Sequence, residues 1–287
     1  MKWQGRQGSD NVEDQRGGGG GGFGGMKLGG VGLVIVLIVS LLTGQNPMTL
    51  LQTVNQAMPE QTAEGQAPQG PQPDDPAAEF VGVVLKDTED VWDKVFAEKG
   101  MTYQRPKLVL FRSSVSSACG NASAAMGPFY CPVDSKVYID LSFYDELKEK
   151  FGAPGDFAMA YVVAHEVGHH VQNLLGTSGK MDAARSRMSK TEYNALSVRL
   201  ELQADYFAGL WANRADKEKH ILEAGDIDEA LTAANAIGDD KLQKEGQGYI
   251  VPDAFTHGTS AQRKRWFRAG FDNGTLEAGN TFEAESL

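Results

Sequence analysis

The sequence predicts an α+β domain that is mainly helical and carries a small β-sheet. Two observations support this fold class. From residue 79 onward most apolar residues recur at helical spacing, and only two short apolar runs have the composition of strands. Several helices around a small sheet make up an α+β domain. The chain has 287 residues, which is enough to bury a core that folds unaided.

The first half of the predicted domain, residues 79–287, contains one helix and both strands. Apolar residues from Phe80 to Phe96 fit one amphipathic helix, which Gly100 ends. The runs 108–111 and 137–141 are the strand candidates. No internal repeat is visible.

The second half is predicted to be helical. A long apolar helix covers about 156–175 and ends at Gly176. Ser189 followed by Glu192 has the pattern of a capping box, which predicts a helix from there to about residue 213. Two more helices open at similar pairs: Asp226 with Glu229, and Thr259 with Gln262.

Three segments precede the domain. Residues 1–27 are polar and rich in glycine and show no apolar periodicity, so we expect them to be disordered. Residues 28–44 form an uncharged apolar run at the short end of the range for a membrane span. Residues 45–78 are rich in Gln, Pro, Gly and Ala and predict a flexible linker.

We interpret residues 28–44 as a transmembrane signal anchor. A secretory signal peptide would have a shorter polar start and a small-residue cleavage site. A buried core helix would need a folded partner that the flanking sequence does not offer. Lys and Arg precede the run and none follows it until Lys86, which predicts a cytoplasmic N-terminus. The expected protein is therefore single-pass in the inner membrane, with its domain on the extracytoplasmic, periplasmic side.

The net charge of −11 argues against a nucleic-acid partner, because phosphate binding needs a basic surface. An acidic surface is most simply a soluble one. Cys119 and Cys131 are the only cysteines, so a four-cysteine zinc site is excluded. In an oxidising compartment they would form a disulfide that pins a loop rich in Gly, Ser and Pro. The alternative is two buried free thiols.

The run His165-Glu166-Val167-Gly168-His169 carries the strongest chemical signal. Histidines four apart on a helix place their rings on one face, where they can share a zinc ion. Glu166 can reach a metal-bound water and take its proton. The alternative is a surface helix with hydrogen-bonded histidines. The run from Phe157 to Ala164 carries no charge, however, and burying these polar groups without a partner would be costly.

A catalytic zinc needs a third protein ligand and an open coordination position. The predicted helix 190–213 offers Glu201, and the intervening chain allows an antiparallel return to the metal. Asp205 lies one turn later on the same face and can accept the second ring N–H of a zinc-binding histidine. The alternative is a solvated carboxylate pair, although Phe207 and its neighbours make this helix apolar nearby.

His257 and Arg263 flank the start of the last predicted helix. A histidine there can donate to a developing oxyanion, and Arg263 can pair with a carboxylate near the site. The sequence is equally consistent with a histidine in a surface loop and an arginine on the surface, neither with a role in the site. His170 is rotated by about 100° from its neighbour on the helix, so we expect it to pack rather than to bind metal. The strand that carries Asp140 is a candidate for edge pairing with an extended peptide.

These features together resemble the bacterial neutral zinc metallopeptidase family. The resemblance covers almost the whole chain and includes the glycine-rich head and the single anchor. The motifs that carry it, in order, are Tyr130-Cys131-Pro132, Val137-Tyr138-Ile139-Asp140, 165–170, 201–205 and 257–263. The resemblance implies a zincin-like fold of the glutamate-zincin type, Zn²⁺ as cofactor, and hydrolysis of a peptide or protein substrate.

The chain is also similar to the CAAX-prenyl-protease-like group within that class. This group has a ligand glutamate four residues before an aspartate, and a histidine six residues before an arginine. The similarity implies that Glu201 is the third ligand and that His257 stabilises the transition state. Gly258 stands where the group has proline, and this chain has one apolar span rather than several. We therefore expect a site that faces solvent rather than the bilayer.

The resulting hypothesis is a membrane-anchored zinc metalloendopeptidase in which Glu166 is the general base. His165, His169 and Glu201 would hold the metal, with Asp205 and Arg263 behind them. Two alternatives stay open. One is a membrane-tethered, non-enzymatic binding module on the same scaffold, and the other is a structural zinc protein whose site a fourth protein ligand closes.

Overall fold

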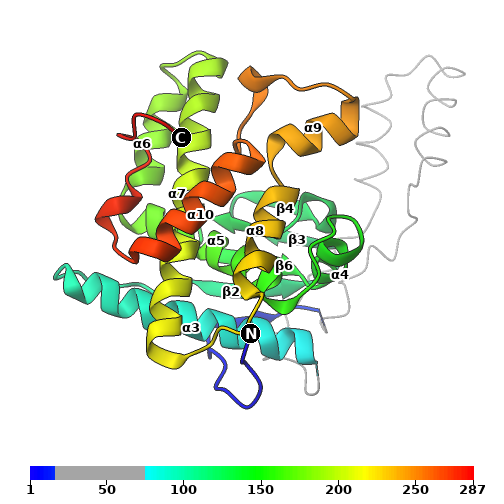
Figure 1. Ribbon diagram of the computed structural model, residues 1–287, viewed down its shortest axis with the longest axis vertical. Helices are drawn as coiled ribbons and strands as arrows, with labels where there is room; N and C mark the ends of the chain where they lie inside the picture. The colour runs from blue at the N-terminus through cyan, green and yellow to red at the C-terminus, as the bar shows by residue number, and fades with distance from the viewer. Residues whose placement is uncertain (17–74) are drawn as a thin grey trace, which may run out of the picture. The chain divides into compact units, whose positions relative to one another are not determined.

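The computed structural model describes residues 1–16 and 75–287 (Figure 1). The predicted anchor, residues 28–44, lies outside the described residues, as does nearly all of the predicted linker. Within the two described stretches, no helix combines the length and the hydropathy needed to cross a bilayer. Residues 1–15 and 75–287 belong to one compact unit.

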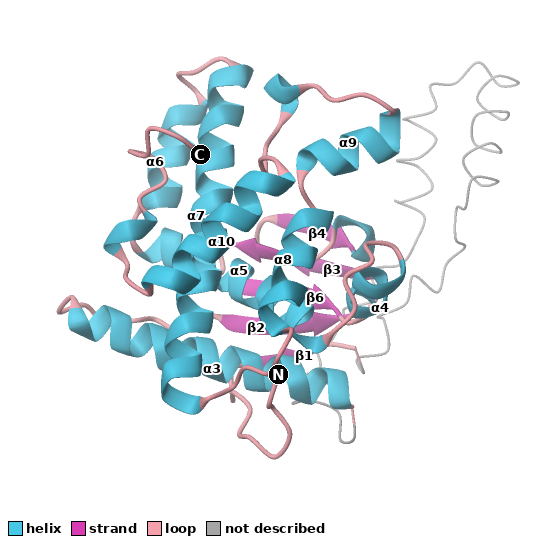
Figure 2. Cartoon of the chain, viewed as in Figure 1, coloured by secondary structure: helices cyan, strands magenta, loops and turns pink. Residues whose placement is uncertain are grey.

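The unit contains a four-stranded mixed sheet, and its fold class is the predicted α+β (Figure 2). In spatial order the strands are β1 (Val12–Asp14), β2 (Lys107–Phe111), β6 (Lys136–Asp140) and β5 (Phe129–Cys131). β2 runs parallel to β1 and to β6, whereas β5 is antiparallel to β6. The two strands predicted from apolar runs are thus confirmed as β2 and β6.

The two faces of the sheet are buried against different partners. Because side chains alternate along a strand, Leu108 and Leu110 of β2 pack into the main helical core, whereas Val109 and Phe111 point the other way. That second face is covered by a small hairpin of β3 (Ser114–Ser117) and β4 (Gly120–Ser123). The hairpin is short and polar, so it offers no hydrophobic pattern from which strands can be predicted.

Helices cover the face of the sheet that carries Leu108 and Leu110. They are α3 (Pro76–Glu98), α4 (Ser142–Glu149), α5 (Asp156–Leu174), α6 (Thr177–Arg185), α7 (Lys190–Lys219), α8 (Asp226–Ala236), α9 (Asp239–Gln247) and α10 (Ser260–Asn273), with short 3₁₀ turns at Ala124–Met126, Pro252–Ala254 and Glu277–Gly279. The five helices that the sequence predicts are confirmed as α3, α5, α7, α8 and α10. The short helices α4, α6 and α9 were not predicted.

Local side-chain capping explains where α3, α7 and α10 begin. The capping boxes at Ser189 and Thr259 are both present. α8 begins at Asp226, as predicted, although Gly225 is its N-cap and the Asp226 carboxylate accepts from the Glu223 N–H. α3 begins at Pro76, earlier than predicted, because Asp75 caps it and proline suits the first helical position.

Two close helix crossings bring distant parts of the chain together. A Cβ on Gly168 of α5 would lie 3.0 Å from the Ala204 carbonyl oxygen of α7. A Cβ on Gly270 of α10 would lie 2.0 Å from the Tyr206 carbonyl oxygen of α7. Glycine therefore allows α5 and α10 to approach α7 more closely than a larger residue would permit, and all three helices contribute to the candidate site.

The N-terminal residues correct one prediction. Residues 1–27 were expected to be disordered, yet β1 lies in the sheet, with Val12 opposite Leu108 of β2. The expectation failed because a three-residue strand shows no apolar periodicity of its own. The partners that hold it are polar and lie far away in the sequence: Glu13 pairs with Lys107 and Lys136 at 2.6 and 2.7 Å.

The predicted disulfide between Cys119 and Cys131 is present. It joins the turn between β3 and β4 to the edge strand β5. We expect the Cys119→Ala/Cys131→Ala double variant to lose about 3 kcal/mol of unfolding free energy, because the open loop gains entropy in the unfolded chain. Urea unfolding measures this loss. Reducing the parent protein should produce the same change, and equal stability with and without the bridge would contradict the expectation.

Candidate metal centre

Three side chains from two helices converge at one point. His165 and His169 come from α5 and Glu201 comes from α7, and one ligand atom from each lies within 4.8 Å of the other two. His165 Nε2 is 3.2 Å from Glu201 Oε2, and His169 Nε2 is 3.5 Å from Glu201 Oε1. The structure thus brings together the three residues that the sequence proposed as ligands.

Hydrogen bonds on the far side of each ring fix its orientation. His165 Nδ1 lies 2.9 Å from the Asp205 carboxylate, and His169 Nδ1 lies 2.9 Å from Gln172 Oε1. Gln172 donates its amide N–H to the Leu200 carbonyl, so its oxygen faces the ring. Both Nδ1 atoms can therefore donate, and each Nε2 faces Glu201.

This arrangement fits a metal cation. Burial lowers the pKa of His165, but Asp205 and Glu201 outweigh it and raise the pKa to about 9. The site thus stabilises positive charge, which a metal ion supplies when both rings are deprotonated. Two histidines and one glutamate form a known set of protein ligands for catalytic zinc, with Nδ1 held by outer-shell acceptors as here. The donor set and its supporting hydrogen bonds suit Zn²⁺, since nitrogen and carboxylate oxygen are both ligands that zinc accepts.

Asp205 is the centre of a buried polar network. It accepts from His165, from the Tyr161 hydroxyl at 2.5 Å, and from two nitrogens of Arg263 at 2.9 Å each. Burial opposes its ionisation, but Arg263 and His165 more than compensate, so the pKa of Asp205 lies well below its ordinary value. The predicted positions of Asp205 behind a histidine and of Arg263 beside a carboxylate both agree with these contacts.

Glu166 faces the same cavity. It lines the cleft together with His165, His169 and Glu201, and its side chain is buried. Burial raises the pKa of Glu166, although His169 and His165 oppose this shift. A raised pKa makes the carboxylate a stronger base, which suits it to accept a proton near neutral pH.

His257 reaches the cleft from the loop before α10. Its Nδ1 lies 3.2 Å from Asp239, which also accepts from the backbone N–H groups of Thr256, His257 and Gly258. The hydrogen bond to Asp239 raises the pKa of His257 and so favours its protonated form. Asp239 thus holds both the loop and the ring, and His257 lines the same cleft as Glu166.

The cleft itself is a cavity of about 660 Å³ with a largely apolar wall. Met126, Phe129, Phe143, Phe151, Val162 and Met181 contribute to this wall. A concave apolar pocket with a few convergent polar groups is the usual form of a small-molecule or peptide site.

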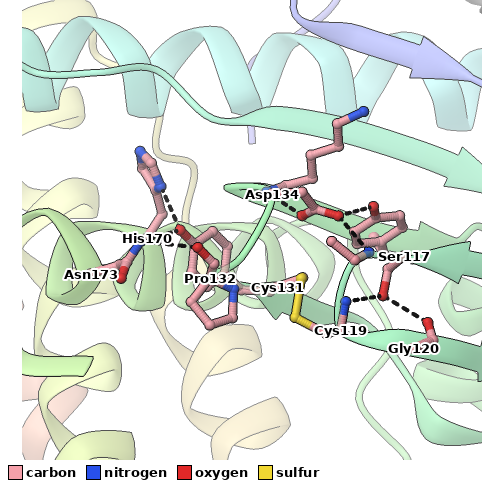
Figure 3. Close-up of a disulfide and its surroundings, with 12 residues drawn as sticks. Ser117, Cys119, Gly120, Cys131, Pro132, Asp134, His170 and Asn173 are labelled. Carbon is pink, nitrogen blue, oxygen red and sulfur yellow. Dashed lines mark hydrogen bonds between the residues drawn. A yellow bond between two sulfur atoms is a disulfide. The ribbon is translucent and has the colours of Figure 1, made fainter. Parts of the chain in front are cut away.

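His170 has a structural role, as expected. Its Nε2 donates to the Gln104 carbonyl, so its Nδ1 accepts from the Tyr130 hydroxyl at 3.0 Å. Asn173 also donates to Tyr130, at 3.1 Å. Figure 3 shows His170 and Asn173 on one side of β5 and the disulfide of Cys131 on the other. The edge strand beside the cleft is therefore fixed both to α5 and to the β3–β4 hairpin.

Sequence reasoning missed three residues of the site: Tyr161, Gln172 and Asp239. Gln172 could have been found, because it lies three positions after His169 on the same helical face. Tyr161 lies four positions before His165, in a run that reads as core. Asp239 carries no signal, since its contact with His257 depends on how the loop returns. The strand that carries Asp140, considered for edge pairing with a peptide, is β6, an inner strand between β2 and β5, so this expectation is wrong. Asp140 itself accepts from the N–H groups of Ser113 and Ser142.

A second group of acids could in principle hold a metal: Asp156, Asp226 and Glu229. Protein groups already occupy these carboxylates. The Met1 amino nitrogen lies 2.5 Å from Asp156 and 3.3 Å from Asp226, and Glu229 accepts from the Phe157 N–H. We therefore assign no metal to this group.

Comparison with known proteins places the chain in context. A sequence profile described as "Putative neutral zinc metallopeptidase" matches residues 1–282. The uncharacterized protein YpfJ of Escherichia coli (strain K12) is 50% identical over 292 residues, which cover 98% of this chain and 99% of that protein. The uncharacterized protein Rv2575 of Mycobacterium tuberculosis (strain H37Rv) is 44% identical over 195 residues, covering 64% of this chain and 65% of that protein. No solved structure matches the chain.

Proposed function

The chain belongs to the putative neutral zinc metallopeptidase family, and on this premise we propose that it hydrolyses peptide bonds at the site formed by α5 and α7. The family implies Zn²⁺ as the cofactor and peptides or proteins as substrates. The observation that carries the proposal is the convergence of His165, His169 and Glu201 within 4.8 Å, with Glu166 in the same cleft.

Each side chain then has a distinct task. His165, His169 and Glu201 hold Zn²⁺, which supplies a Lewis acid that polarises a carbonyl and makes water more acidic. Glu166 accepts the proton of the attacking water and delivers it to the leaving amine. His257 donates a hydrogen bond to the oxygen on which negative charge develops.

The supporting residues keep this geometry rigid. Asp205 fixes the ring of His165, and Arg263 and Tyr161 in turn fix Asp205. Gln172 does the same for His169. Outer-shell partners of this kind orient metal ligands and raise their basicity.

The edge strand β5 is our candidate for binding the substrate backbone. It is one of the two outer strands of the sheet, and its residues Phe129 and Tyr130 line the cleft. An extended peptide can add to such an edge by main-chain hydrogen bonds. The apolar wall of the cleft favours substrates with apolar side chains next to the scissile bond.

The geometry favours this function over the two alternatives. In a structural zinc site a fourth protein ligand closes the coordination sphere. Within residues 1–16 and 75–287, the group formed by His165, His169 and Glu201 gains no fourth His, Cys, Asp or Glu. An open position and an adjacent buried base are features that a binding module would not need.

We further propose that the chain associates with a membrane through the apolar run 28–44 and that its domain lies outside the cytoplasm. The run itself supports the first point, because it contains no charge and is just long enough to insert. The Cys119–Cys131 disulfide supports the second, because such bonds persist in oxidising compartments.

The proposal is tested by measuring metal content and peptide hydrolysis on the full chain. We expect about one zinc per chain and cleavage of members of an unbiased peptide library. A chelator should abolish cleavage, and added Zn²⁺ should restore it. A purified, zinc-loaded protein that binds peptides but cleaves none would favour the binding module. A protein that neither binds zinc nor cleaves would refute the site.

The role of His257 gives a separate prediction. We expect His257→Ala to lower kcat about 10²-fold with little change in KM, because the lost hydrogen bond forms mainly in the transition state. Asp239→Asn should keep the ring but lower the pKa of His257, because the acceptor that favours the protonated form is weakened. The alkaline limb of the pH–rate profile should therefore move to lower pH. An unchanged profile would argue against His257 as the donor.

A further inference from the structure

The N-terminal segment, residues 1–15, is bound to the domain by backbone hydrogen bonds along its whole length. These bonds join Lys2 N to Ile221 O, Ser9 N to Gly82 O, Leu108 N to Asn11 O and Gln15 N to Leu110 O, at 2.8–3.0 Å. They reach α3, β2 and the chain after α7. The segment is thus a part of the fold rather than a tail that touches it at one point.

Two buried acids of α3 have polar partners in this segment. Glu89 is 1% exposed and accepts from Ser9 Oγ at 2.6 Å and from Asn11 Nδ2 at 2.7 Å. Asp87, also 1% exposed, pairs with Arg6 and with Lys219. Buried carboxylates are costly unless they are paired and hydrogen-bonded. The segment therefore adds partners to those within the domain, where Lys219 pairs with Asp87 and Arg105 lies 3.7 Å from Glu89.

Apolar contacts add to the polar ones. Met1 and Val12 are both buried and belong to the main hydrophobic core. Trp3 packs edge-on against Phe80 of α3, with ring centroids 5.5 Å apart. The Met1 amino nitrogen contacts Asp156, the first residue of the metal-binding helix α5. The segment therefore joins the same core that supports the candidate site.

These contacts restrict how the chain can relate to a membrane. The segment and the rest of the domain are separated in the sequence by the apolar run 28–44. A single crossing by that run would place them on opposite sides of a hydrocarbon layer about 30 Å thick, whereas β1 and β2 are hydrogen-bonded neighbours. Pairing with the segment of a second copy would not help, because that segment would also lie on the far side.

We propose that residues 1–15 and 75–287 lie on the same side of the membrane, and that the run 28–44 does not carry the chain from one side to the other. This proposal replaces the expectation that the N-terminus and the domain lie on opposite sides of the membrane. That expectation rested on charge asymmetry alone, and the positive residues that produced it include Arg6, which the fold uses to pair with Asp87.

Thiol labelling of the full-length protein in intact cells tests this. Each engineered thiol is introduced into the Cys119→Ala/Cys131→Ala background, because a reducing compartment would open the disulfide. The sequence has no other cysteines, so the engineered thiol is then the only reactive one. Gln4→Cys reports on the segment and Lys217→Cys on the domain, and both positions are exposed. Each variant is treated with a membrane-impermeant maleimide before and after lysis with a mild detergent that leaves the protein folded.

We expect both thiols to react to the same extent before lysis, or both to react only after it. The first result places the common side outside the cytoplasm and the second places it inside, and either supports the proposal. Reaction of one thiol before lysis and of the other only after lysis would overturn it. This outcome does not depend on peptidase activity, so it is independent of the proposed hydrolysis. Reaction of both thiols only after lysis would contradict the external location of the domain proposed above.

A stability measurement checks that the N-terminal segment is docked on the domain. Glu13→Lys would place a third ammonium group beside Lys107 and Lys136. We expect it to lower Tm by roughly 2–4 °C relative to Asp10→Lys, an exposed position in the same segment. Equal Tm values for the two variants would mean that β1 does not pair with the sheet, and the proposal would fail.

Discussion

Glu166→Gln is expected to lower kcat by a factor of 10²–10⁴ while zinc binding stays at the level of the parent protein. The substitution keeps the size of the side chain and removes only its ability to accept a proton. General-base catalysis contributes rate enhancements of this size. Glu166 is not one of the three converging ligand residues, so the metal site should form normally. The measurement is single-substrate kinetics on a cleaved library peptide, with zinc content determined on the same preparation.

Glu146→Gln is the matched control. Glu146 also lines the cleft, but it pairs with Lys150 on its own helix turn and lies outside the converging group. The control should keep kcat within a few-fold of the parent value. Equal losses in both variants would point to a general effect of charge in the cleft. Full activity of Glu166→Gln would remove the proposed mechanism.

The chemistry of this site could be predicted from the sequence because most of it is local. His165, Glu166 and His169 lie within one helical turn, so a helix places them together whatever the rest of the chain does. The prediction of Glu201 as a ligand required only that α7 pack against α5. His257 was less certain, because it belongs to a loop. Its position depends on Asp239, whose four hydrogen bonds to that loop no spacing rule reveals.

Most of the fold could be predicted for similar reasons. The prediction failed where an element depends on long-range contacts. Helices such as α5 and α7 carry their own periodicity and caps, so their limits were predicted well, although α7 extends beyond residue 213. β1 is different, because its three residues gain their structure from β2, more than ninety positions later. Its polar sequence resembles a disordered tail, whereas in the fold Glu13 pairs with Lys107 and Lys136 and the strand pairs with β2.

Asp205→Asn is expected to lower the unfolding free energy by about 3–5 kcal/mol, the cost of breaking a buried ion pair from one side. Asp205 is fully buried, and Arg263 is 2% exposed. The variant keeps the volume of the side chain but leaves the guanidinium without a counter-charge. The loss would be a large part of the 5–15 kcal/mol that stabilises a typical domain. Urea unfolding of the metal-free protein isolates this effect from that of zinc.

Two comparisons separate the ion pair from other causes. Asp182→Asn changes an exposed acid at the rim of the cleft and should stay within about 0.5 kcal/mol of the parent. Adding Arg263→Gln to Asp205→Asn removes the unpaired charge, so the double variant should be less destabilised than the sum of the two single changes. Strict additivity would show that the pair does not act as a unit.

We expect the affinity for zinc to depend on Asp205 as well, for a different reason. An asparagine oxygen still accepts from His165 Nδ1, but without its charge it holds the ring less firmly and makes it a weaker ligand. We expect zinc affinity of Asp205→Asn to fall about 10–100-fold, measured by competition with a chromophoric chelator. Loss of stability with unchanged zinc affinity would assign Asp205 to the fold alone. Loss of both would show that one buried carboxylate connects the core at α10 to the metal ligands on α5.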